Sequence, residues 1–231
     1  MISVVAVLEG RVVEQFELGH GHDPATELAA RGWLGQPVSA VRSSPHDLAI
    51  TYAVAARVRR RGETPPGAPA AGVEQDHGLS EAEVAAAVPY QRIAAYAVVR
   101  SVRGVLMTQL SERTNAAGLW NLPGGGLDHG EEPLDAVVRE VHEETGQRVA
   151  DVRLLTVMTR HWVGRAPSGR VENFHAVRLF HTAACAEPTD PVVLDVGGST
   201  SDARWVPETE LASLPLASSV PDALAVAGEL A

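Results

Sequence analysis

The chain has 231 residues, of which 45% are hydrophobic and 4% aromatic, and its formal net charge is −10 at pH 7. This length is enough for one large domain or two small ones with a buried core. The negative charge argues against a general nucleic-acid binder and against a protein that binds acidic membranes, because both need a basic surface.

The first third of the chain is predicted to form a small α+β domain over 1–61. The sequence does not indicate the role of this domain. Its start has no basic region followed by a long apolar run, so we expect neither a signal peptide nor a membrane span. We therefore expect a cytoplasmic protein. The predicted elements are strands over 2–8 and 11–17, a short helix capped by Asp23 or Thr26, a strand over 37–42, and a strand or helix over 47–61.

A linker is predicted over 62–79, where Gly, Pro and Ala are frequent and no hydrophobic periodicity is present. Ser80 and Glu83 have the spacing of a capping box, so a second domain over 80–231 is expected to begin with a short helix. Strands are then predicted over 93–100, 105–110, 149–160 and 170–183, loops over 111–119, 161–169 and 190–201, and helices over 208–214 and 221–230. Strands on both sides of a central helix favour a mixed sheet between helices.

That central helix follows three glycines and is predicted to end at Gly146, a typical C-terminal stop. Pro133 suits its first turn. At about 100° per residue, one apolar stripe is expected to face the core. Its members are Leu134, Val137, Val138 and Val141.

Glu140, Glu143 and Glu144 lie together on another face of the same helix. Like charges at this spacing repel one another, so they indicate a bound cation, and hard divalent cations prefer oxygen ligands. The alternative is a solvated acidic face on an ordinary amphipathic helix, which a bare pattern of this kind would favour.

The surrounding spacing decides between these interpretations. Gly125 is followed after five residues by Glu131, and then after seven by the run from Arg139 to Gly146. This pattern, with Trp120-Asn121-Leu122-Pro123 before it, resembles the Nudix box, the signature of the Nudix hydrolase superfamily, and the resemblance extends over about 91–216. Only the last specified position departs, because Gln147 stands where an aliphatic residue is expected.

The resemblance implies an α/β/α sandwich with a mixed sheet, and hydrolysis of a nucleoside diphosphate linked to another moiety. It implies Mg²⁺ or Mn²⁺ as the cofactor, held by Glu140, Glu143 and Glu144 and by the carbonyl of Gly124. Glu140 is also the family's candidate for activating water, and the local alternatives are Glu172, His161 and Asp202. The resemblance further implies that Arg139 and Glu131 form an ion pair that braces the glycine loop against the helix.

The resemblance implies a small nucleotide as the substrate: a nucleoside triphosphate, an oxidised nucleotide, ADP-ribose or a nucleotide sugar. All 19 basic residues are arginine, so arginines in the flanking loops are the candidates for phosphate contacts. The candidate substrate-binding residues are Arg113, Arg165, Arg170 and Glu172. The alternative function is a regulatory module that senses a nucleotide without turning it over. No nucleic-acid or membrane partner is expected. The N-terminal segment could form the interface of a homodimer.

Overall fold

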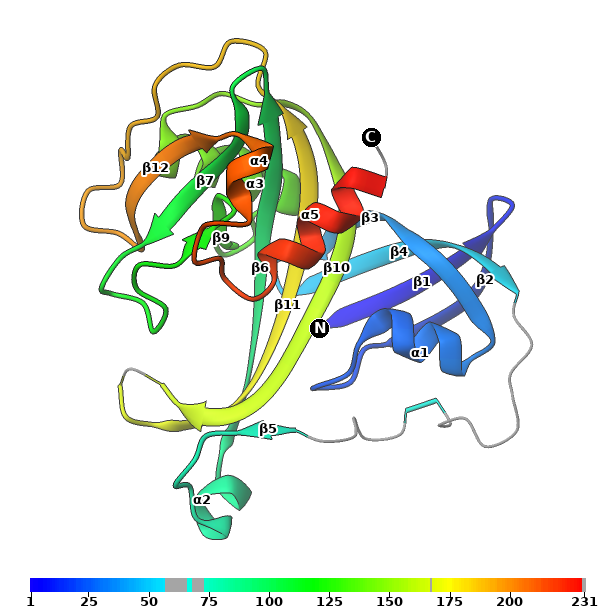
Figure 1. Ribbon diagram of the computed structural model, residues 1–231. Helices are drawn as coiled ribbons and strands as arrows, with labels where there is room; N and C mark the ends of the chain where they lie inside the picture. Colours follow the sequence, from blue (N-terminus) through cyan, green and yellow to red (C-terminus); the bar gives the residue numbers. More distant parts are fainter. Residues whose placement is uncertain (57–65, 68–72, 167, 230–231) are drawn as a thin grey trace. The chain divides into compact units, whose positions relative to one another are not determined.

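The computed structural model describes residues 1–56, 66–67, 73–166 and 168–229 (Figure 1). The chain divides into two compact units. Unit 1 consists of 1–93 and 157–178, and unit 2 of 94–156 and 179–231. These units do not share the limits 1–61, 62–79 and 80–231 expected from the sequence. Much of the expected linker, 62–65 and 68–72, lies outside the described residues.

Unit 1 contains a four-stranded sheet in the order β2-β1-β4-β3. Strand β1 pairs antiparallel with β2 and parallel with β4, and β3 pairs antiparallel with β4. Alternate side chains of β1 and β4, among them Val4 and Ile50, are fully buried on one face of this sheet, as the two-residue period of a strand requires. The strands are β1 (Ile2–Leu8), β2 (Arg11–Glu17), β3 (Trp33–Ser44) and β4 (Asp47–Ala56).

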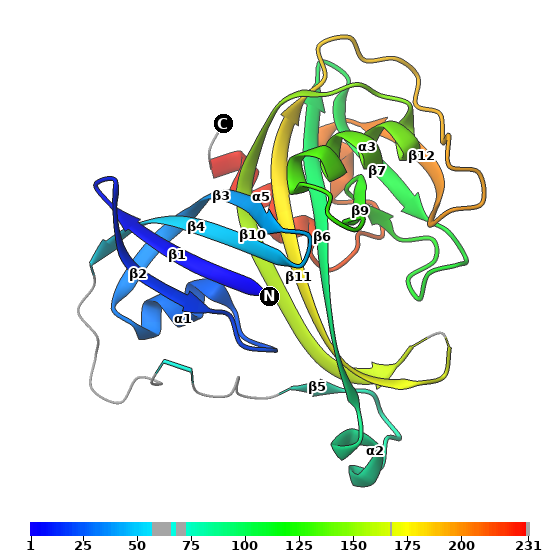
Figure 2. The ribbon, with the colours of Figure 1, turned by 180° about the vertical axis from the view of Figure 1, so that it is seen from behind.

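The predicted short helix is α1 (Pro24–Ala30), which lies against this sheet (Figure 2). Asp23 is its N-cap, because its side chain accepts a hydrogen bond of 2.8 Å from the backbone N–H of Thr26. Thr26 is therefore inside the helix and is not the cap. The stretch after Ser44, which the sequence left open, is a strand as far as Ala56, and the rest of the predicted element lies outside the described residues.

The remaining elements of unit 1 are short, or are parts of longer strands. Strand β5 (Glu74–Gln75) pairs parallel with β10, at Trp162 and Val163. Helix α2 (Glu81–Ala85) begins with the predicted capping box: the Ser80 hydroxyl accepts from the Glu83 N–H, and the Glu83 carboxylate accepts from the Ser80 N–H. This prediction is confirmed.

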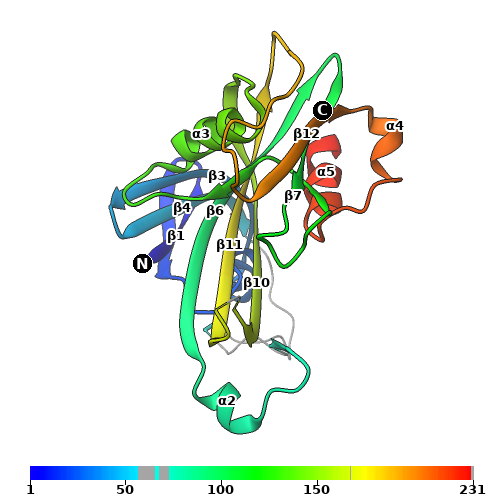
Figure 3. The ribbon, with the colours of Figure 1, turned by 90° about the vertical axis from the view of Figure 1, so that its left-hand side faces the viewer.

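The larger sheet has the strand order β12-β7-β6-β11-β10-β5, with β8 beside β7 and β9 beside β6. In unit 2, α3 lies on one side of β7 and β12, and α4 and α5 lie on the other (Figure 3). This is the mixed sheet between helices that the sequence predicts. The elements are β6 (Val88–Ser101), β7 (Gly104–Leu110), β8 (Trp120–Asn121), β9 (Gly124–Gly126), α3 (Pro133–Thr145), β10 (Ala150–Arg165), β11 (Val171–Ala184), β12 (Thr200–Val206), α4 (Glu208–Leu211) and α5 (Val220–Glu229).

The predicted loop over 161–169 is wrong in its first half, because β10 continues to Arg165. The added strand residues include Trp162 and Val163, which are types that favour strands. They also gain a partner in β5, a pairing at long sequence distance that no local pattern announces.

The predicted apolar stripe of α3 is only half right. Val137 and Val141 are fully buried, whereas Leu134 and Val138 are 43% and 44% exposed. The buried face of α3 includes Ala136 and Glu144 in place of Leu134 and Val138. This face packs on a core that contains Ala95, Leu106 and Trp205. Hydrophobic spacing alone did not indicate that a carboxylate belongs to the buried side.

Gln147, the departure from the Nudix box, is a buried polar anchor in unit 2. Its amide Nε2 donates to the Thr189 hydroxyl at 2.9 Å, and its Oε1 accepts from the Thr189 N–H at 3.0 Å. Val149 packs at the edge of the neighbouring core. None of the described helices is long and apolar enough to cross a membrane.

Candidate functional site

The triple-glycine segment is a short strand, β9, and not the loop expected from the sequence. It pairs antiparallel with β6, where Tyr96 lies opposite Gly124 and Ala95 opposite Gly125. A Cβ at Gly124, whose φ is +143°, would lie 2.6 Å from the Tyr96 Cα, and a Cβ at Gly125 would lie 2.6 Å from the Glu140 Oε1. Glycine is therefore needed here because both the neighbouring strand and a glutamate of α3 approach the backbone closely.

Arg139 is the centre of a hydrogen-bond network between β9 and α3. Its guanidinium donates to both carboxylate oxygens of Glu131, at 2.7 and 2.9 Å, so the ion pair implied by the resemblance is present. It also donates to Glu140 at 3.0 Å, to Glu143 at 3.1 Å and to the carbonyl oxygen of Gly126 at 3.3 Å. These contacts, led by the hydrogen bonds to Glu131, raise the pKa of Arg139, and they hold two of the three glutamates beside the glycines.

Glu144 is held separately and is only 5% exposed. Its Oε2 accepts from the backbone N–H of Gly124 at 2.9 Å, and its Oε1 accepts from the Thr200 hydroxyl at 2.5 Å. Burial raises its pKa to about 7, against the opposing effect of these two donors. Burial also raises the pKa of Glu140, and the charge of Arg139 opposes that shift. A positive charge nearby would therefore stabilise the ionised form of both carboxylates.

The donor set suits a hard divalent cation, because Glu140 and Glu144 contact β9 and Glu143 lies beside them on the same helix. Within the described ranges, however, no three His, Cys, Asp or Glu side chains are arranged so as to hold a metal ion directly. Glu140 and Glu143 bond to the Arg139 guanidinium instead. A cation at this site would therefore compete with Arg139 for two of its ligands.

The segment before β12 folds over the C-terminal end of α3. The N–H groups of Leu194 and Asp195 both donate to the carbonyl oxygen of Glu143, at 2.8 and 3.0 Å. The charge of Asp195 is also among the causes that raise the Glu144 pKa. Asp202, the alternative base predicted after the loop over 190–201, has a carboxylate that accepts from the adjacent Ala203 N–H.

Arg113 lines a cavity of about 450 Å³ in unit 2. Thr200, the hydroxyl donor to Glu144, is part of the same lining. Gly197 lies opposite, where an added Cβ would be 3.5 Å from an Arg113 guanidinium nitrogen. In the described part of the chain no carboxylate pairs with Arg113, whereas Arg103 in the same unit pairs with Asp190 at 2.7 Å. Glu112 also lines the cavity, but no ion pair joins its carboxylate to Arg113 among the described residues.

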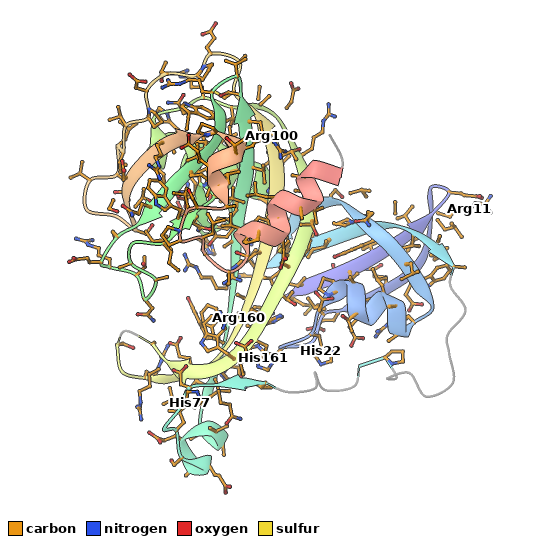
Figure 4. The ribbon with its side chains drawn as sticks, viewed as in Figure 1. Arg11, His22, His77, Arg100, Arg160 and His161 are labelled. Carbon is orange, nitrogen blue, oxygen red and sulfur yellow. The ribbon has the colours of Figure 1, made fainter. Side chains whose placement is uncertain are left out.

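The other predicted substrate residues belong to unit 1. Arg165 forms an ion pair with Glu83, and Arg170 forms one with Glu172 at 2.6 Å. His161, an alternative base, donates from its Nε2 to the Asn173 Oδ1 at 2.5 Å. Figure 4 shows His161 on β10, facing the loop that carries His22. Each of these side chains thus has a partner within unit 1.

Thr200 and Asp195 are not among the site residues predicted from the sequence. The acidic, glycine-rich composition of 190–201 was a usable signal for Asp195. No local signal marked Thr200, since an isolated threonine far from the glutamates is most often an ordinary strand residue.

A family model described as "NUDIX domain" matches residues 90–225. The chain belongs to the NUDIX domain family. Curated relatives include the protein named RNA pyrophosphohydrolase from Brucella anthropi, 42% identical over 67 residues; the match covers 26% of this chain and 37% of that protein. The protein of the same name from Francisella tularensis is 38% identical over 73 residues, which are 32% of this chain and 44% of that protein. The chain thus spans less than half the length of these relatives.

Solved Nudix structures are also similar. A MutT NUDIX hydrolase from Burkholderia pseudomallei is 26% identical with a TM-score of 0.47, and the match covers 59% of this chain and 97% of that one. The NUDIX domain of NrtR from Shewanella oneidensis, solved with ADP ribose, is 22% identical with a TM-score of 0.46, covering 66% and 99%.

Proposed function

We propose that this Nudix protein is a divalent-metal-dependent pyrophosphohydrolase that acts on a nucleoside diphosphate linked to another moiety. The observation that carries the proposal is the meeting of Glu140 and Glu144 with the glycine strand β9: Gly125 leaves room for the Glu140 carboxylate, and the Gly124 N–H donates to Glu144. Glu143, on the same helix, is joined to Glu140 through Arg139. Arg139 offsets the charge of Glu140 and Glu143, whereas Glu144 pairs with no cation among the described residues. The family match supports the same reading.

Glu140, Glu143, Glu144 and the carbonyl oxygen of Gly124 are the proposed ligands of Mg²⁺ or Mn²⁺. When bound, such a cation neutralises charge on the diphosphate and favours ionisation of the attacking water. Arg139 and Glu131 brace α3 against β9 through their paired hydrogen bonds. Glu140 is also the proposed proton acceptor for the attacking water, the role that the resemblance gives to this position.

Arg113 is the proposed phosphate contact among the arginines named from the sequence. Its guanidinium has no carboxylate partner in the described residues, and it lines the same cavity as Thr200. Arg165 and Arg170 already form ion pairs with glutamates, so they would have to exchange those partners for a phosphate. Arg113 needs no such exchange.

The proposed substrates are a nucleoside triphosphate, an oxidised nucleotide, ADP-ribose or a nucleotide sugar. The relatives named RNA pyrophosphohydrolase add the 5′-triphosphate end of an RNA to the compounds worth testing. The net charge of −10 favours the small nucleotides, because a long RNA would be repelled by an acidic surface.

The test is phosphate release from a panel of these compounds with Mg²⁺ or Mn²⁺, with a phosphatase added where the products need it. Metal-dependent turnover of one class would support the proposal and name the substrate. Glu140→Gln and Glu144→Gln should each lose most of that turnover, whereas the control Glu210→Gln, at an exposed position on α4, should retain it. Binding of metal and a nucleotide with no turnover of any compound would favour the nucleotide-sensing module instead.

A further inference from the structure

The Glu144 carboxylate is oriented from two strands that are distant in sequence. Its Oε2 accepts from the Gly124 N–H in β9, and its Oε1 accepts from the Thr200 hydroxyl at the start of β12. Glu144 and Thr200 are each 5% exposed, so water does not readily replace either donor. A carboxylate oxygen has two lone pairs, and each Glu144 oxygen therefore keeps one after these bonds are made.

The other two glutamates are held differently. Glu140 and Glu143 bond to Arg139, a residue of their own helix. Among the described residues, Thr200 is the side chain that donates to Glu144. The direction of this carboxylate thus depends on a strand that begins 56 residues after it.

A β-bulge explains why Thr200 faces inward. In the pairing of β12 with β7, Thr200 lies opposite Leu110 and Asp202 lies opposite Gln109, so Ser201 is an extra residue. Thr200 and Ala203 are buried, whereas Ser201 and Asp202 between them are exposed. With strict alternation from Ala203, position 200 would face outward. The extra residue turns Thr200 toward α3, as bulges commonly re-aim side chains near functional sites.

We propose that Thr200 is a positioning residue for the metal site: its hydroxyl fixes the plane of the Glu144 carboxylate so that the remaining lone pairs are presented to the cation. This inference rests on the proposed function, in which Glu144 is a metal ligand. Partners that orient a metal ligand typically change metal affinity or activity by about 10- to 100-fold when they are removed.

The test compares Mn²⁺ binding to the full-length wild type and to Thr200→Val, Thr200→Ser and Thr108→Val, followed by the loss of the free Mn²⁺ signal in electron paramagnetic resonance. Valine keeps the shape of threonine but lacks the hydroxyl, and serine keeps the hydroxyl. Thr108→Val is the matched control, because Thr108 is a buried threonine of β7 whose hydroxyl bonds to the Asn121 carbonyl and, among the described residues, to no glutamate. Thermal denaturation of each variant without metal reports on the fold.

We expect Thr200→Val to weaken Mn²⁺ binding by about 10-fold or more, Thr200→Ser to stay within about threefold of the wild type, and Thr108→Val to match it. Wild-type affinity in Thr200→Val, or an equal loss in Thr200→Ser, would overturn the inference. Turnover is measured in parallel: a wild type that binds Mn²⁺ but hydrolyses nothing contradicts the proposed function and leaves the Thr200 comparison valid. A wild type that binds no Mn²⁺ overturns both.

Discussion

Gly21 packs directly against the ring of His161. A Cβ at position 21 would lie 2.6 Å from the His161 Cε1 and closer still to its Nδ1, and the φ of Gly21 is +79°. His161 also contacts His20 and His175, with ring centroids 5.3 and 6.2 Å away. The glycine thus lets the loop before α1 lie against a cluster of three histidines on that loop, β10 and β11.

Gly21→Ala should therefore destabilise unit 1 by about 2 kcal/mol or more, since it adds a steric clash to an unfavourable backbone angle. The measurement is the free energy of unfolding in urea. Gly10→Ala is the control, because Gly10 has a φ of +78° with nothing within 4 Å of an added Cβ. If both variants lose the same stability, the contact with His161 contributes nothing.

His175 makes the stability of this cluster depend on pH. Burial, followed by the nearby His20 and His161, lowers its pKa to about 4. Gln91 donates to its Nδ1 at 2.9 Å, which suits a neutral ring. The unfolded chain would take up a proton near pH 6.5 while the folded ring would not, so stability is complete above that pH and is lost as the pH falls.

Between pH 7.5 and 5.5, His175 should therefore cost the fold about 1.4 kcal/mol. We expect the wild type to lose this much more stability than His175→Gln over that interval, in urea denaturation followed by circular dichroism. His20, His22 and His161 are unchanged in the comparison, and the interval lies above the range in which carboxylates usually titrate. Parallel losses in the two proteins would rule out His175 as the source.

Gln147→Leu should destabilise unit 2 even though it restores the aliphatic residue of the Nudix box. Leucine would leave the Thr189 N–H without the acceptor it has at 3.0 Å and the Thr189 hydroxyl without a donor. A buried group that loses its partner typically costs about 1–3 kcal/mol. Thermal unfolding of Gln147→Leu beside Gln109→Leu, a more exposed position on β7, measures the difference. A more stable Gln147→Leu would contradict this account.

The parts of the fold that were predicted correctly rest on short-range patterns. The capping box at Ser80, the strand pattern after Ile2 and the helix stop at Gly146 each act within a few residues, and the structure contains all three. The Nudix box is also local, which is why one helix and its preceding glycines could be recognised from spacing alone.

The parts that were missed depend on contacts between distant segments. Thr200 reaches Glu144 because of a bulge in β12, and Gln147 bonds to Thr189, 42 residues away. The exposure of Leu134 and Val138 follows from how α3 lies on its sheet. Helical periodicity fixes which residues share a face, but the neighbouring strands decide which face is buried.

Arg139→Lys should lower kcat/KM by about 10- to 100-fold, the range typical for groups that orient metal ligands. Lysine keeps the charge, but it cannot bond to both oxygens of Glu131 and reach Glu140 and Glu143 together. The assay is steady-state turnover of the substrate found in the panel. Arg148→Lys, at an exposed position just after α3, is the control. Unchanged kcat/KM in Arg139→Lys would show that the Arg139 guanidinium does not orient the glutamates of α3.

Arg113→Met should raise the KM for the nucleotide by about 10-fold and leave kcat within about threefold of the wild type. A hydrogen bond to a charged group contributes about 1.5–3 kcal/mol, and about 1.4 kcal/mol corresponds to a factor of ten in binding. The effect falls on KM because no hydrogen bond or ion pair joins Arg113 to the glutamates of α3 within the described residues. Arg103→Met removes an arginine that already pairs with Asp190, so its KM should stay at the wild-type value. Equal changes in KM in the two variants would contradict a contact in the cavity. They would mean that KM rises because an acidic protein has lost a positive charge.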